Sequence, residues 1–202
     1  MSMTFRAVRV RIAPDEIPYA IRNRGGHVTA TTNARIAGLT LILYIAAGIA
    51  SMALHSMPHA TEMLRLASSF CALTLGVTLY ALTRDQDADI ALLALACRLL
   101  EAVSGKDAPI YFSVGSTLFC WLFLRGRMIP RGLALLGLAA SAFLVVVLPL
   151  QRLELLGGPT GWSSSITWLE WLPMLVFEVA FALWLITKGA APHATFRKVG
   201  GN

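Results

Sequence analysis

The chain has 202 residues, of which 56% are hydrophobic and only 14% are charged, and its mean hydropathy is +0.67. These values exclude an ordinary soluble domain, in which about a quarter of the residues are charged. The formal net charge is +6, but the basic residues are clustered between apolar runs, so lipid headgroups explain them better than a nucleic acid does. The composition therefore predicts an integral membrane protein with the lipid bilayer as its partner and with no nucleic-acid partner.

Residues 1–33 form a basic segment in which five arginines outnumber Asp15 and Glu16. The apolar run of a secretory signal peptide does not follow these arginines, so we predict no cleavage. The alternation in FRAVRVRI fits a short strand or an interfacial segment, but a solvated, poorly ordered tail is the simpler interpretation. We therefore expect a basic cytoplasmic N-terminal tail over 1–33, a membrane domain over 34–187 and a basic cytoplasmic C-terminal tail over 188–202.

Six apolar runs make up the membrane domain. A helix needs about 20 residues to cross a hydrocarbon core of about 30 Å, because it rises about 1.5 Å per residue. The third and fourth runs are short by this measure, so they cross with a recessed turn or a thinned bilayer, or they form a re-entrant hairpin. The predicted fold is an all-α, polytopic transmembrane helical bundle of about six spans, near residues 34–54, 63–83, 88–103, 110–124, 132–150 and 168–187.

Lys and Arg are distributed unequally between the two ends of these runs. Of the 17 such residues, Arg98 lies within a run, three lie on one side (Arg65, Lys106 and Arg152), and the remaining 13 lie on the side of the N-terminus. The positive-inside rule then places both termini in the cytoplasm. Tryptophans are expected at the membrane interfaces, with Trp162, Trp168 and Trp171 at the outer one and Trp121 and Trp184 at the inner one.

Ionisable residues inside the apolar runs are the main functional signal. Arg98 and Glu101 share one helix face, because residues three apart are neighbours there, and Glu178 interrupts the sixth run. With the rise of a helix, Arg98 lies about 14 Å and Glu101 about 18 Å from the inner face, and Glu178 about 15 Å from the outer face. Charges near the midplane are costly and mark a functional site by default. We therefore predict a ligand or proton site of Arg98, Glu101 and Glu178, with Glu178 as the partner of Arg98.

The charge balance of this cluster leads to a second expectation. One guanidinium and two carboxylates carry a net charge of −1 if all are ionised, and an uncompensated charge does not persist in a low-dielectric site. We therefore expect Glu101 or Glu178 to hold a proton near neutral pH. Two alternatives stay open: a buried ion network that only locks the third helix to the sixth, and no contact between the groups.

Other site chemistry has little support in the sequence. His55 and His59 are four residues apart, but Pro58 lies between them and no third ligand is evident, so loop histidines are favoured over a zinc site. The remaining histidines are outside the spans, which argues against a b-type haem. Neither a GxSxG motif nor a P-loop is present, and the three cysteines read as small hydrophobic residues. We therefore predict no cofactor and no metal, and an intramembrane enzyme ranks last.

Several blocks resemble a known family, with the blocks in the family's order: ARIAGL, LLALACRLLEA, VGSTLFCWLFLRGRMIPRGLALLGLAAS and FEVAFALWLITKG. They are similar to bacterial polytopic membrane proteins catalogued as domain of unknown function 4386, over roughly residues 34–189. The resemblance implies a helical fold in the bacterial inner membrane and implies no activity. Arg98 and Glu101 match the family's R-L-x-E-A block, and Glu178 matches the acidic residue of its last helix. The sequence departs from the family between Glu101 and Tyr111, where relatives usually have a longer third helix and loop.

Two function classes follow from these observations. In the first, the cluster binds or transports a small solute or a proton, which discontinuous helices at Gly105 or Pro173 would support. In the second, the protein is a structural or regulatory partner of another membrane protein, or a homo-oligomer, that packs through its glycine-rich first span. A sealed Arg98–Glu178 pair would favour the structural role, and a cavity open to one side of the membrane would favour binding or transport.

Overall fold

The computed structural model describes residues 19–155 and 165–190, with side chains from residue 30 onward. Within these ranges the chain forms helices joined by short turns and contains no strand, which confirms the all-α prediction. In chain order the elements are α1 (Tyr19–Ala53), α2 (Pro58–Thr83), α3 (Ala88–Val103), the 3-10 turn η1 (Gly105–Asp107), α4 (Ala108–Gly126), α5 (Arg131–Arg152) and α6 (Ser165–Thr187).

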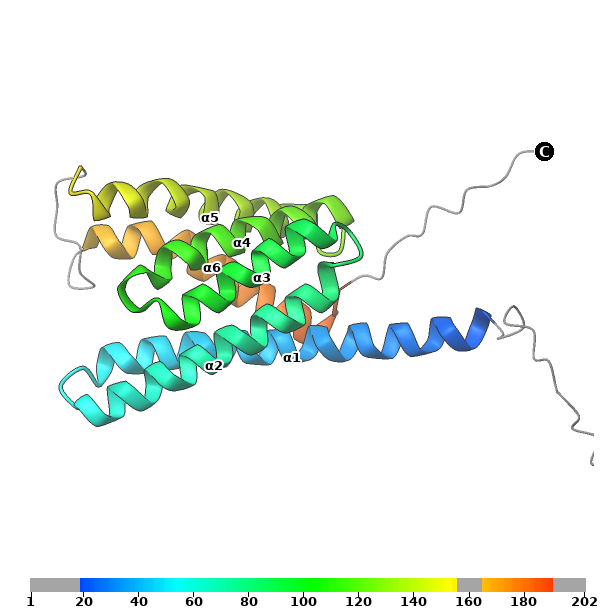
Figure 1. The fold of residues 1–202 in the computed structure, drawn as a ribbon, viewed down its shortest axis with the longest axis horizontal. Coiled ribbons are helices and arrows are strands. Elements are labelled where there is room, and N and C mark those ends of the chain that lie inside the picture. Colours follow the sequence, from blue (N-terminus) through cyan, green and yellow to red (C-terminus); the bar gives the residue numbers. More distant parts are fainter. Residues whose placement is uncertain (1–18, 156–164, 191–202) are drawn as a thin grey trace, which may run out of the picture.

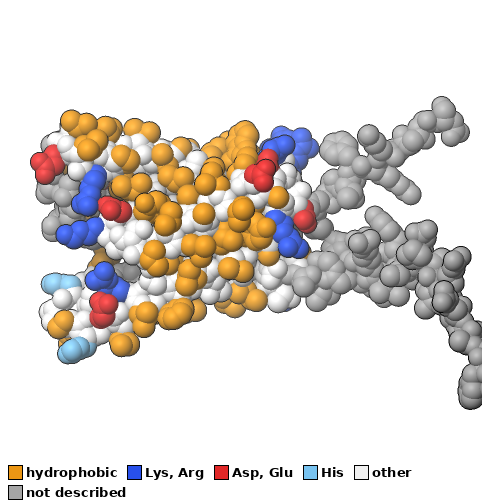
Figure 2. Space-filling model, viewed as in Figure 1, with side chains coloured by type: hydrophobic (Ala, Val, Ile, Leu, Met, Phe, Trp, Pro, Cys, Tyr) orange, Lys and Arg blue, Asp and Glu red, His pale blue; other side chains and the backbone are white. Residues whose placement is uncertain are grey.

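The six helices form a closed antiparallel bundle (Figure 1). Each helix packs on its neighbours in the chain, α6 returns to pack on α1, and α2 also touches α4. Hydrophobic side chains cover the middle of the visible surface, and charged side chains gather at the two ends of the bundle (Figure 2). An outer surface of this kind suits lipid, which solvates apolar side chains and leaves the charges in the headgroup regions.

Five segments of the described chain are long and apolar enough to cross a membrane: Ala30–Ala53, Pro58–Thr83, Gly105–Gly126, Arg131–Arg152 and Ile166–Thr187. The chain is therefore a multi-pass membrane protein. The sixth helix, α3, has only 16 residues, so the prediction of a short third helix agrees with the structure. Asp87 fixes its start, because the Asp87 carboxylate accepts a hydrogen bond from the backbone amide of Ile90 at 3.2 Å, which satisfies a free donor of the first turn.

The prediction of a short fourth span is wrong. Gly105–Gly126 has 22 residues and is long enough to cross. Gly105 adopts a left-handed φ of +56°, which glycine tolerates without steric cost, so the turn after α3 is tight. Pro109 then lies in the first turn of α4, where its missing amide hydrogen has no partner to lose. Ala108 and Pro109, which were predicted as loop residues, therefore belong to α4.

Two further predictions about helix boundaries need correction. α1 begins at Tyr19 rather than near residue 34, because extending an existing helix needs no new nucleation step; the predicted irregular tail is therefore wrong for residues 19–33. α6 continues through Pro173 without a break. Membrane helices tolerate proline because neighbouring groups satisfy the backbone carbonyl that proline leaves without a partner. The FRAVRVRI segment, Trp162 and the end of the C-terminal tail lie outside the described residues.

α1 and α6 touch near the end of the bundle where α1 begins and separate toward the other end. A Cβ on Gly38 of α1 would lie 2.8 Å from the backbone oxygen of Ala182 on α6 and 2.8 Å from Cγ1 of Ile186. A Cβ on Gly48, further along α1, would meet nothing within 4 Å. The ends of α1 and α2 near Met57 also lie apart from α4, α5 and α6 (Figure 1). α1 and α6 are therefore in close contact toward one end of the bundle only.

Gly38→Ala is expected to destabilise the fold by about 1–3 kcal/mol, because the added methyl group meets the backbone of α6. Gly48→Ala is the matched control on the same helix, and it should be neutral or slightly stabilising, since alanine favours a helix over glycine by up to about 1 kcal/mol. Thermal unfolding in detergent, followed by circular dichroism, measures the difference. Equal melting temperatures for the two variants would contradict the close α1–α6 contact.

Candidate functional site

Small residues on two helices let α3 approach closely and bury its charged side chains. A Cβ on Gly76 of α2 would lie 2.9 Å from Cβ of Arg98, and one on Gly115 of α4 would lie 3.1 Å from Cβ of Cys97. Such contacts between membrane helices depend on residues without a bulky side chain. As a result Arg98 is only 3% exposed and Glu101 is 5% exposed.

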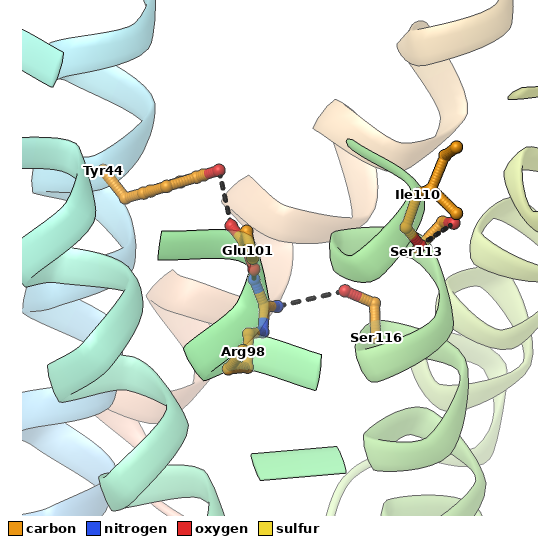
Figure 3. Close-up of polar contacts among 6 residues, drawn as sticks. All are labelled: Tyr44, Arg98, Glu101, Ile110, Ser113 and Ser116. Atoms are coloured by element: carbon orange, nitrogen blue, oxygen red, sulfur yellow. Dashed lines mark hydrogen bonds and ion pairs between the residues drawn. The ribbon is translucent and has the colours of Figure 1, made fainter. Parts of the chain in front are cut away.

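Arg98 is held by a network that joins α1, α3 and α4 (Figure 3). Its Nη1 lies 2.8 Å from Oε2 of Glu101, and its Nη2 donates to Oγ of Ser116 at 3.0 Å. The hydroxyl of Tyr44 donates to the other carboxylate oxygen of Glu101 at 2.8 Å. The guanidinium carbon also lies 4.8 Å from the ring centroid of Phe112. Hydrogen bonds to charged groups are stronger than neutral ones, so this network ties the three helices together.

Glu178 does not join this network, and the predicted pairing of Arg98 with Glu178 is wrong. Arg98 forms its ion pair with Glu101, which lies about one turn away on the same helix. This pair therefore forms within α3 and does not depend on another helix. Glu178 is 8% exposed, and its Oε1 has no hydrogen-bond partner among the described residues. Nε of Arg98 is also buried without a partner. The depths counted along the two helices did predict that Arg98 and Glu178 lie near each other. Both residues line a small pocket of about 20 Å³, together with Ser116.

A larger cavity also reaches Glu178. It has a volume of about 310 Å³ and is lined by α1, α4, α6 and one residue of α2. We call it the vestibule, and its lining includes Tyr44, Gly48, Phe112, Trp168, Trp171 and Glu178. It lies where α1 has separated from α6, and its size is within the range of small-molecule sites, about 300–1,000 Å³. Among its described lining residues Glu178 is the only acid and there is no base.

Tyr44 connects the two parts of the site. Its hydroxyl is bonded to Glu101, while the residue also lines the vestibule, and its ring is stacked with that of Phe112 at a centroid distance of 6.5 Å. The sequence did not single out Tyr44, Phe112 or Ser116. A polar or aromatic residue in the middle of an apolar run was the available signal, but it is too common to identify a contact across helices.

The histidines and cysteines are not gathered into a site. The exposed His55 ring has its Nδ1 3.1 Å from the backbone oxygen of Met52, near the α1–α2 connection. Cys97 and Cys120 are buried, Cys71 is partly buried, and all three are free thiols. Across the described ranges no group of three His, Cys, Asp or Glu side chains is arranged to hold a metal ion.

Residues 107–189 match the family described as Domain of unknown function (DUF4386). Over this segment, which is less than half of the chain, the protein is similar to that family. The match includes Phe112, Ser116 and Glu178 on α4 and α6, and it begins after Arg98 and Glu101. No curated protein and no solved structure matches the chain. Because the DUF4386 family has no assigned function, the function has to be argued from the site itself.

Arg98→Leu is expected to destabilise the protein by about 3–5 kcal/mol, because Glu101 is left buried without its counter-charge. The double variant Arg98→Leu, Glu101→Leu should recover much of this loss, since it removes both charges. Arg125→Leu is the control: its pair with Asp87 spans 3.2 Å and its side chain is 54% exposed, so its loss should cost less than about 1 kcal/mol. Unfolding in detergent tests this, and equal stability of Arg98→Leu and Arg125→Leu would contradict it.

Proposed function

We propose that this membrane protein binds a small solute in the vestibule, with Glu178 as the polar group that the solute contacts. The observation that carries the proposal is the position of Glu178, whose Oε1 is buried without a partner beside a cavity of about 310 Å³. A cavity that is mostly apolar and has a few convergent polar groups is the usual form of a small-molecule site.

The energetic argument concerns the cost of an unpaired carboxyl group. Burying a polar group without a hydrogen bond costs about 1–3 kcal/mol, and burying an isolated charge costs far more. Arg98 and Glu101 are buried as a pair, whereas Glu178 has no such partner, so we take it to be retained for a partner that enters from outside. A solute or a proton is the partner that the vestibule admits.

Arg98 and Glu101 have a different role in this proposal from the one that the sequence suggested. They act as positioning residues, because Glu101 holds the Tyr44 hydroxyl and Tyr44 forms part of the vestibule lining. The small pocket shared by Arg98 and Glu178 has about 20 Å³, enough for one water molecule. A water there would connect Nε of Arg98 to Oε1 of Glu178 and make the ion pair sensitive to what Glu178 binds.

The alternative is a structural or regulatory membrane partner in which the cluster only holds helices together. The network of Arg98, Glu101, Tyr44 and Ser116 supports it, since three helices are joined by buried bonds. The glycine-rich face of the first span, which was predicted to pack on a partner, does not support this alternative. Gly38 already packs on α6, and Gly48 lines the vestibule. A vestibule that binds nothing, with Glu178 freely replaceable, would favour this alternative.

Filling the vestibule should abolish solute binding. Gly48→Leu places a side chain into the cavity, while Gly132→Leu is the matched control, because a Cβ at either position meets nothing within 4 Å and Gly132 is not part of the vestibule lining. We expect wild-type and Gly132→Leu protein in lipid nanodiscs to bind trimethylphenylammonium or its carbon isostere tert-butylbenzene with one-to-one stoichiometry, and Gly48→Leu not to. Isothermal titration calorimetry, with empty nanodiscs subtracted, measures this. Binding of neither probe to the wild type would contradict the proposal.

We also propose that the protein lies in a bacterial inner membrane with both termini in the cytoplasm. The distribution of positive charge supports this orientation. Arg65, Lys106 and Arg152 lie at the end of the bundle where the vestibule is found, and the cationic residues toward the opposite end include Arg35, Arg84, Arg125, Arg127, Arg131 and Lys188. The vestibule then belongs to the outer half of the membrane.

Cysteine labelling tests this orientation. Lys106→Cys and Arg84→Cys introduce thiols at exposed positions at opposite ends of the bundle. A membrane-impermeant maleimide added to intact cells should label Lys106→Cys and not Arg84→Cys, and both should react once the membrane is opened. The unsubstituted chain gives the background from its own cysteines. Labelling of Arg84→Cys alone in intact cells would reverse the orientation.

A further inference from the structure

We propose that the solute of the vestibule is an organic cation, and that it takes the place of a proton on Glu178. The inference rests on the proposed function, because it names the chemical class of the solute that the vestibule binds. Three features of the described residues support it: the aromatic walls, the absence of a counter-charge for Glu178, and the acid–base groups around its carboxyl.

Aromatic rings form much of the vestibule wall. Tyr44, Phe112, Trp168 and Trp171 all line it, and the rings of Phe112 and Trp171 are 5.8 Å apart at their centroids. Ring faces attract cations, and cages of several rings bind quaternary ammonium groups. The protein already uses this attraction once, since the Arg98 guanidinium lies over the Phe112 ring at 4.8 Å. The same wall therefore suits a cationic solute.

The charge of the site favours a cation over an anionic or a neutral solute. The positive charge of Arg98 is matched by Glu101 at 2.8 Å, which leaves the carboxyl of Glu178 without a counter-charge. An anionic solute would find no basic residue among the described vestibule lining and would be repelled by an ionised Glu178. A neutral apolar solute would leave the carboxyl group unpaired, and a neutral polar one would offer a hydrogen bond but no counter-charge. A cation supplies the missing charge, and it does so where low dielectric strengthens the attraction.

The exchange with a proton follows from electroneutrality. The titratable groups around Glu178 come from three helices: Tyr44 of α1, Arg98 and Glu101 of α3, and Cys120 of α4. Among the described residues, α2 and α5 contribute no titratable side chain to the lining of either cavity. In the empty site the Glu178 carboxyl holds a proton. When the cation binds, the O–H bond of the carboxyl breaks, the proton passes to water, and the carboxylate pairs with the cation. The net charge of the site stays at zero in both states.

A pair of isosteric probes tests the proposal on the unmodified protein. Trimethylphenylammonium and tert-butylbenzene differ by a nitrogen cation in place of a carbon atom. In lipid nanodiscs we expect the cation to bind about tenfold or more tightly than the neutral probe. Its binding enthalpy should also change with the ionisation enthalpy of the buffer, because a proton is released, and the enthalpy of the neutral probe should not.

Glu178→Gln removes the charge and keeps the shape of the side chain. We expect it to weaken binding of the cation by about tenfold or more and to leave binding of tert-butylbenzene unchanged, which also shows that the vestibule is intact. Glu170→Gln is the matched control on the same helix, because Glu170 is bonded by Gln151 and is not part of the vestibule lining. It should bind both probes as the wild type does.

The outcomes separate this inference from the proposed function. If the two probes bind with equal affinity and Gly48→Leu blocks both, the proposed preference for a cation is contradicted, but the proposed solute site is supported. Binding of neither probe would overturn the proposed function itself. A preference for the cation without any dependence on the buffer would overturn the exchange with a proton. Because the comparison of the two probes needs no variant, the proposal remains testable even if Glu178→Gln fails to fold.

Discussion

The ion pair between Arg98 and Glu101 is the interaction on which the rest of the described structure depends. It lies on the short helix α3, and its two groups are 2.8 Å apart and almost fully buried. A charge in such a place is tolerated only when its counter-charge and its remaining hydrogen bonds are supplied. Tyr44 of α1 and Ser116 of α4 supply two of these bonds, and glycines on α2 and α4 provide the close contact that excludes lipid. The pair therefore determines how four helices meet.

The same pair explains why Glu178 is chemically distinct. Arg98 carries one positive charge, and it forms its ion pair with Glu101 on the same helix. Glu178 lies on α6 at a similar depth without forming an ion pair among the described residues, and it borders both the small pocket and the vestibule. A single helical bundle thus contains a satisfied carboxylate and an unsatisfied one. The first holds helices together, and the second is the group that we propose binds a proton or a solute.

The vestibule is a consequence of how α1 leans on α6. Backbone contact at Gly38 brings the helices together on one side of the membrane, and the spacing that opens beyond it leaves room around Gly48. Aromatic residues fill part of this space and form a wall that is mostly apolar, so water has few partners there apart from Glu178 and a few hydroxyl groups. Tyr44 belongs to both regions, and any change in the vestibule can reach the ion pair through its hydroxyl.

The features that depend on residues close together in the sequence could be predicted from it. Long apolar runs predicted the helical membrane fold, and the three-residue spacing placed Arg98 and Glu101 on one face, because both are properties of a single helix. Helix depth brought Glu178 to the level of Arg98 for the same reason. The boundary errors at α1 and α4 came from treating glycine, proline and polar residues as breaks, although a growing helix includes them when its neighbours and its end position allow.

Only the tertiary structure decided which groups are partners. The sequence offered two carboxylates for one guanidinium, and the choice of Glu101 over Glu178 depends on the directions in which the side chains leave two helices, α3 and α6. The roles of Tyr44 and Ser116, and the existence of the vestibule, depend in the same way on the angle between α1 and α6. Depth along a helix is a sum of identical rises and can be counted from the sequence. Rotation and tilt between helices come from packing over the whole bundle, and the sequence does not display them.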